Sequence, residues 1–127
     1  MDIDVENAFT KLLAMADVNP DTLVQDVFRF FVYISKDNIN DRFENFCKVY
    51  NNGRVPKLPK IGEDDCMPAS LKNLKAGNIK AVILLIAFFD VLGKYFIFNK
   101  HEKDTIDKDK YVDYMKKLKK VGASYVE

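Results

Sequence analysis

The sequence predicts an all-α protein, a compact bundle of five to six helices around a central apolar helix at about residues 79–98. Apolar residues recur every three or four positions in successive segments, as they do along one face of an α-helix. Residues typical of helix starts and ends bound these segments, and the alternation of a half-buried strand is almost absent. The chain has 127 residues and 48% apolar content, which suffices for one domain with its own core, and we expect residues 1–127 to form that domain.

The first two helices are predicted from apolar stripes near the N-terminus. Asn19 is suited to cap the second helix, and Pro20 to occupy its first position, where no backbone N–H is needed. The expected inward residues are Val5, Ala8, Phe9, Leu12, Leu13 and Ala16 in the first helix, and Leu23, Val24, Val27, Phe28, Phe31 and Ile34 in the second.

A third helix is expected after a polar break, with Asp37 or Asn38 as its N-cap and an Asn-Asn-Gly sequence at its end. A long connection follows at about 51–69, where three prolines and two glycines interrupt any helical or strand period. The inward residues of the third helix are Ile39, Phe43, Phe46, Cys47 and Tyr50.

The central helix is the most apolar segment of the chain. Pro68 is placed to open a short helix that stops at Gly77, and Asn78 to cap the central helix. Because the central helix is apolar nearly all round, we expect the other helices to surround it. The run 82–89 taken alone also fits a buried strand, since so short a run cannot be typed by its period.

A last amphipathic helix is expected to start at Thr105 as N-cap and to end at Gly122, with Tyr111, Tyr114, Met115 and Leu118 on one face. The sequence before it resembles the second half of an EF-hand, with Ile106 at loop position eight and Asn99 at position one. Lys103 then replaces a ligand at position five, and Lys110 replaces the bidentate glutamate at position twelve. The sequence therefore predicts no calcium site here.

The cysteines and the N-terminus indicate a cellular location. Cys47 and Cys66 are the only cysteines, and the chain opens with an acidic MDIDVE sequence where a secretory signal would be basic and then apolar. We therefore expect free thiols and an intracellular, cytoplasmic protein. The longest apolar run, 81–89, ends at Asp90, whereas a bilayer span needs about 20 residues, so we expect no membrane span.

Enzymatic chemistry is disfavoured by a single count. The one histidine, His101, lies in a charged segment, and any Cys-His or Ser-His-Asp site would have to use it. Cysteines and histidine lack paired metal-ligand spacing, and the glycines are isolated, which disfavours a zinc site or a phosphate-binding loop. We expect no catalytic residue, no metal and no cofactor, and hence a protein that is not an enzyme.

Charge is distributed unevenly along the chain. Residues 1–70 contain eight basic and twelve acidic residues, a net charge of −4, and residues 71–127 contain twelve and seven, a net charge of +5. In the last helix, Lys116, Lys119 and Lys120 fall together and are the candidate phosphate contacts of a nucleic-acid-associated accessory subunit. Arginine is scarce, with three residues, while Lys, Asn, Ile and Phe are abundant, as in AT-rich genomes such as those of some viruses.

The ten phenylalanines and six tyrosines suggest a docking surface. Phe30 and Tyr33 lie on the side of the second helix that its apolar stripe leaves free, so either this helix is buried on two sides or it presents these rings to a partner. The preferred hypothesis is a small non-catalytic helical protein that binds another protein, or itself as an oligomer, through Phe30 and Tyr33. The alternative is the accessory subunit that uses the lysine-rich last helix.

Overall fold

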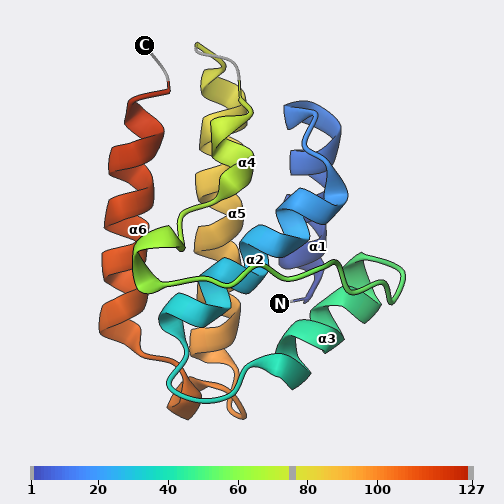
Figure 1. Ribbon diagram of the computed structural model, residues 1–127, viewed down its shortest axis with the longest axis vertical. Helices are drawn as coiled ribbons and strands as arrows, with labels where there is room; N and C mark the ends of the chain where they lie inside the picture. The colour runs from blue at the N-terminus through green and yellow to red at the C-terminus, as the bar shows by residue number, and fades with distance from the viewer. Residues whose placement is uncertain (1, 75–76, 126–127) are drawn as a thin grey trace.

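The computed structural model describes residues 2–74 and 77–125 and confirms the all-α bundle (Figure 1). Within these residues the sole β-type pairing is a bridge between Ser35 and Ile106. Two short 3-10 turns, η1 (Glu63–Asp65) and η2 (Lys103–Thr105), interrupt the connections. The helices are α1 (Asp2–Ala16), α2 (Pro20–Ile34), α3 (Asn40–Tyr50), α4 (Ala69–Lys72), α5 (Ile79–Phe98) and α6 (Lys108–Ala123).

In Figure 1, α1, α5 and α6 stand roughly upright, while α2 crosses in front of α5 and α3 lies at the lower right. The segment between α3 and α4 runs across the front of α2 as an extended strap. The contacts agree with this view, since α5 packs on α1 and α6, and α2 packs on α3, α4 and α6.

The starts of three helices show which cap predictions were correct. The Asn19 side chain accepts hydrogen bonds from the backbone N–H groups of Asp21 and Thr22, and the Asn78 side chain accepts one from Ala81, as predicted. The predicted cap of the last helix was wrong by two residues, because α6 is capped by Asp107, whose Oδ1 lies 3.1 Å from the Lys110 nitrogen. Thr105 belongs instead to η2.

Helix α2 is buried on two sides, which corrects the expectation that Phe30 and Tyr33 form a docking surface. Phe30 is 0% exposed and Tyr33 is 6% exposed. Phe30 packs against Phe89 of α5 and Tyr114 of α6, with ring centroids 5.4 and 4.9 Å apart. The prediction was wrong because α6 covers the side of α2 that the main apolar stripe leaves free.

A buried carboxylate attaches the strap to α2. Asp26 of α2 is fully buried, and its oxygens accept hydrogen bonds from the backbone nitrogens of Ala69 and Ser70, at 2.6 and 2.9 Å, and from the Ser70 hydroxyl. Arg29 pairs with the same carboxylate at 2.9 Å. Asp26 therefore satisfies the first N–H groups of α4 from a different helix, which fixes the end of the strap.

Candidate interaction surfaces

One side of α5 is exposed even though the helix belongs to the core. Its inward side includes Leu85, Phe88, Phe89 and Leu92, which are buried. Its other side leaves Ile79, Ile83 and Phe98 at 51%, 58% and 70% exposure. We define the α5 outer face by the exposed residues of this helix, Ile79, Lys80, Ile83, Ala87, Lys94 and Phe98.

The α5 outer face follows from helical geometry. The positions 79, 83 and 87 are four residues apart, as are 94 and 98, so their side chains lie on one side of the helix. The sequence pattern had indicated a helix that is apolar all round, and the structure shows that α1 and α6 pack on α5 without enclosing it. The apolar residues of α5 that neither α1 nor α6 covers are therefore exposed to solvent.

The polar groups on and beside this face are arranged around Asp90. Its carboxylate pairs with Lys94 at 2.9 Å and accepts a hydrogen bond from the Tyr111 hydroxyl of α6 at 2.9 Å. Partial burial acts to raise the pKa of Asp90, but these two hydrogen bonds and the charges of Lys94 and Lys119 outweigh it and hold that pKa below its ordinary value. Lys119 of α6 therefore adds its charge to this side of the bundle.

Helix α5 also bears on the membrane question. Within residues 2–74 and 77–125 it is the one helix long and apolar enough to cross a bilayer, with a mean hydropathy of 2.2 over its most apolar window. Of that window, 44% is buried inside the fold, and core helices of soluble proteins have the same length and composition. A single such helix is weak evidence either way.

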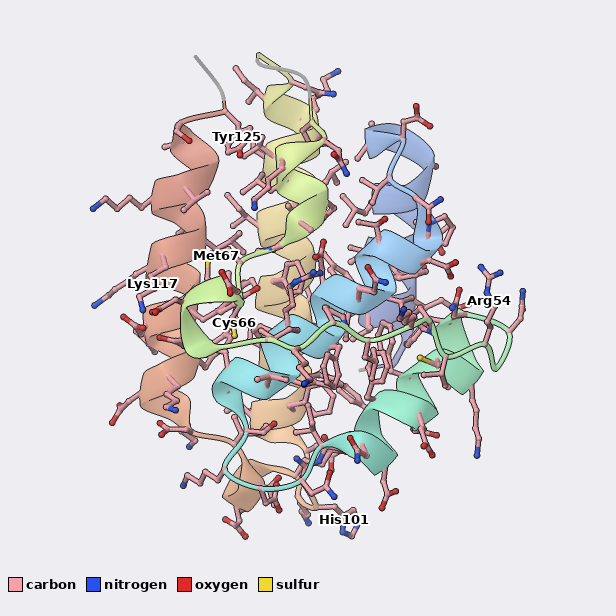
Figure 2. All side chains as sticks on the ribbon, in the orientation of Figure 1. Arg54, Cys66, Met67, His101, Lys117 and Tyr125 are labelled. Carbon is pink, nitrogen blue, oxygen red and sulfur yellow. The ribbon has the colours of Figure 1, made fainter. Side chains whose placement is uncertain are left out.

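The lysines near the end of α6 differ in their contacts. Lys116, Lys119 and Lys120, the candidate phosphate contacts, are all exposed. The Nζ of Lys117 (labelled in Figure 2) pairs with Asp113 of the same helix at 3.1 Å and donates a hydrogen bond to the Tyr33 hydroxyl of α2 at 3.0 Å. These bonds raise the pKa of Lys117 and fix its position. The candidate phosphate contacts are therefore Lys116, Lys119 and Lys120, without Lys117.

A small pocket lies between α1, α3 and α5. Its walls are partly apolar and aromatic, and the polar residues Arg42, Asn45 and Glu102 line it as well. The space open to water-sized probes is about 100 Å³. The pocket brings together residues far apart in the sequence, from Val5 to Glu102, so the apolar periodicity of single helices could not predict it. The apolar and aromatic residues that line it are Val5, Phe46, Val49, Tyr50, Leu92, Tyr95 and Phe96.

The residues considered for catalysis are not arranged as a site. Cys47 and Cys66 are both free thiols, as predicted, and Cys66 of the strap is buried as well as Cys47. Burial, together with the nearby charges of Glu44 and Asp21, raises the pKa of Cys47 to about 11, so this thiol is not activated. His101 is exposed on the loop between α5 and α6, at the bottom of the view in Figure 2, with Cys66 well above it. The described part of the chain contains no group of three metal-ligating side chains.

Comparisons add no relative to these observations. Neither the protein-family models, nor the curated proteins, nor the solved structures give a match to this chain.

Proposed function

We propose that the protein is a non-catalytic binding protein that docks, through the α5 outer face, on an amphipathic helix of a protein partner. That partner helix carries acidic residues beside its apolar stripe. The observation that supports the proposal is the exposure of Ile79, Ile83 and Phe98 on the most apolar helix of the chain. Exposed apolar side chains that share one side of a helix are typical of interaction surfaces.

The charges favour an acidic partner over a second copy of this chain. Lys80 and Lys94 lie on the α5 outer face itself, and the charge of Lys119 reaches Asp90 beside it. Pairing this face with its own copy brings lysines toward lysines, which costs free energy. Carboxylates on a partner make the opposite contribution and also hasten association.

The shape favours a helix. The face runs from residue 79 to residue 98, a distance of about 28 Å at 1.5 Å per residue. Positions 79, 83 and 87, and again 94 and 98, are four residues apart, which matches the anchor spacing of a helix that packs alongside. A bilayer is a poorer match, because the ion pair of Asp90 and Lys94 would enter the headgroup region together with the apolar residues.

A peptide selection tests the chemistry of the partner. A displayed library of helical peptides, with a fixed apolar stripe and randomised flanking positions, is selected on the full-length protein. We expect enrichment of Asp and Glu at the flanks. Selected peptides should lose binding to Ile83→Glu by more than about tenfold, because a charge at the centre of a desolvated contact is unfavourable.

The matched control is Val49→Glu, since Val49 is exposed to a similar degree but lies on α3. It should leave the affinity of the selected peptides unchanged. Enrichment of basic flanks, or peptides that bind Ile83→Glu as well as the parent protein, contradicts the proposal. So does a stable dimer in light scattering that Ile83→Glu dissociates, or sedimentation with anionic vesicles that Ile83→Glu abolishes, since each assigns the face to another occupant.

A second candidate function, the nucleic-acid-associated accessory subunit, is favoured by the exposure of Lys116, Lys119 and Lys120. If these lysines contact phosphates, replacing all three by Ala should reduce the salt dependence of binding by about three units of slope. Retention of the protein on single- and double-stranded DNA and RNA at low salt is the measurement. Unchanged retention, or none in the parent protein, contradicts this candidate.

A further inference from the structure

The pocket between α1, α3 and α5 combines a small volume, lined in part by aromatic rings, with an incompletely satisfied carboxylate. Phe46 and Tyr50 of α3 pack ring against ring, with centroids 4.7 Å apart, and Tyr95 and Phe96 of α5 lie 5.3 Å apart. All four rings line the pocket. Its volume of about 100 Å³ is smaller than the apolar cavity of about 150 Å³ that accommodates benzene, but the pocket opens to solvent beside the exposed Val49, so a ring can enter it in part and extend outward.

The polar contribution comes from Glu102. Its Oε2 atom is buried and accepts no hydrogen bond, and the nearest cation, the Nε of Arg42, is 3.8 Å away. A distance of 3.8 Å is beyond hydrogen-bond range, and a buried acceptor without a donor costs free energy. Burial also raises the pKa of Glu102 against the opposing charges of Arg42 and His101, as expected for a carboxylate with too few donors.

Arg42 does not depend on Glu102 for its own position. Its guanidinium donates to the Thr105 hydroxyl and pairs with Asp37 at 3.4 Å. The terminal torsion of a glutamate is soft, so its carboxylate can turn toward the pocket while Arg42 keeps its other two partners. Glu102 is therefore the group that can accept a new donor.

We propose that this pocket binds a small arylalkyl ammonium ion, a primary amine on a ring-sized apolar body, with the ring between α3 and α5 and the ammonium at Glu102. The rings of Phe46, Tyr50 and Tyr95 supply apolar contact to the ring of the ligand. The ammonium supplies the donor that Oε2 lacks. The site is separate from the α5 outer face, so the two proposals succeed or fail independently.

Three probes of one shape test this inference: benzylamine, benzyl alcohol and benzoate, titrated into the isotope-labelled full-length protein and followed by NMR. Benzylammonium should bind about tenfold more tightly than benzyl alcohol, since both donate a hydrogen bond to the carboxylate but only the ammonium adds an opposite charge, and benzoate should bind most weakly. Glu102→Gln should remove the preference for the ammonium and leave the affinity for benzyl alcohol unchanged.

Two exposed positions provide matched variants that do not disturb the core. Val49 lines the pocket and is 60% exposed, so Val49→Trp should block the binding of all three probes. Val112 of α6 does not line the pocket, and Val112→Trp should have no effect. The inference is overturned if benzoate binds best, if benzyl alcohol equals benzylamine, if Glu102→Gln keeps the preference, or if no probe binds.

Discussion

The ring of Tyr111 occupies the space that a side chain at Gly93 would need. A Cβ placed on Gly93 overlaps three atoms of this ring, and the Tyr111 hydroxyl is held in place by Asp90 at 2.9 Å. The absence of a side chain at this one position of α5 therefore allows α6 to approach it closely. This contact fixes the position of α6 and, with it, the burial of α2.

Gly93→Ala should destabilise the protein even though alanine is the better helix former. The ring must move and give up its bond to Asp90, and overpacking of this kind costs about 1–3 kcal/mol. Urea denaturation measures the change in the free energy of unfolding. Gly122→Ala is the milder comparison and should cost less, because its Cβ would lie 3.1 and 3.2 Å from terminal methyl groups of Ile86 and Val82, which need to shift by only a few tenths of an ångström. A Gly93→Ala protein as stable as the parent contradicts the close packing.

Truncation of Phe30 should be far more damaging than truncation of Phe98. Phe30 is fully buried among rings of α5 and α6, and Phe→Ala in a core costs about 3–5 kcal/mol. Phe98 is 70% exposed, and its loss should change the free energy of unfolding by less than about 0.5 kcal/mol. Thermal and urea denaturation of the two variants measure the contrast. A small loss of stability in Phe30→Ala would contradict the burial of Phe30 in the core.

Much of the fold follows from local signals in the sequence. Asn19 and Asn78 accept hydrogen bonds from nearby N–H groups, and Pro20 stands where the helix needs no N–H, so their roles depend on little beyond the adjacent residues. Local signals did not suffice at the start of the last helix, where Thr105 was predicted as the cap and Asp107 is the cap in the structure. Thr105 forms bonds to Arg42 and to the Glu102 carbonyl, and one of these partners lies 63 residues away.

The interaction surfaces could not be predicted because they are what tertiary packing leaves uncovered. Phe30 and Ile83 are both apolar and both lie on strongly apolar helices, yet α6 covers Phe30 and no described helix covers Ile83. Periodicity gives the dominant stripe of each helix but not the number of neighbours it will have. Likewise, Arg42 and Glu102 meet only after α3 and the loop following α5 have been placed.

The ion pair on α5 should make a pH-dependent contribution to stability. Because the pKa of Asp90 is lower in the folded protein than in the unfolded chain, its contribution is present above the unfolded pKa and is lost as pH falls through the folded pKa. Asp90→Asn should therefore destabilise the protein at pH 7, by less than about 1 kcal/mol for so exposed a pair, and by less still near pH 3.

Denaturation at both pH values measures this difference, with Asp64→Asn in the exposed part of the strap as the control. A larger cost of Asp90→Asn at pH 3 than at pH 7 would show that the pKa is shifted in the opposite direction.

The thiols should resist modification in the native protein. Both are buried, and with a pKa of about 11 Cys47 is about one part in a thousand thiolate at pH 8. Ellman's reagent should react slowly with the folded protein and quickly with both thiols in urea. Val55→Cys, at an exposed position of the strap, supplies a fast-reacting reference. Rapid reaction of either native thiol would contradict the burial described here.

The docking proposal is tested most directly by mapping where a selected acidic peptide binds. Amide chemical shifts of the isotope-labelled protein are recorded as the peptide is added. We predict that the largest changes fall along Ile79–Phe98 and the adjoining part of α6 around Lys119, and that Ile83→Glu removes them. Changes confined to the pocket around Phe46 and Tyr95, or changes that persist in Ile83→Glu, would contradict the assignment of the α5 outer face as the docking surface.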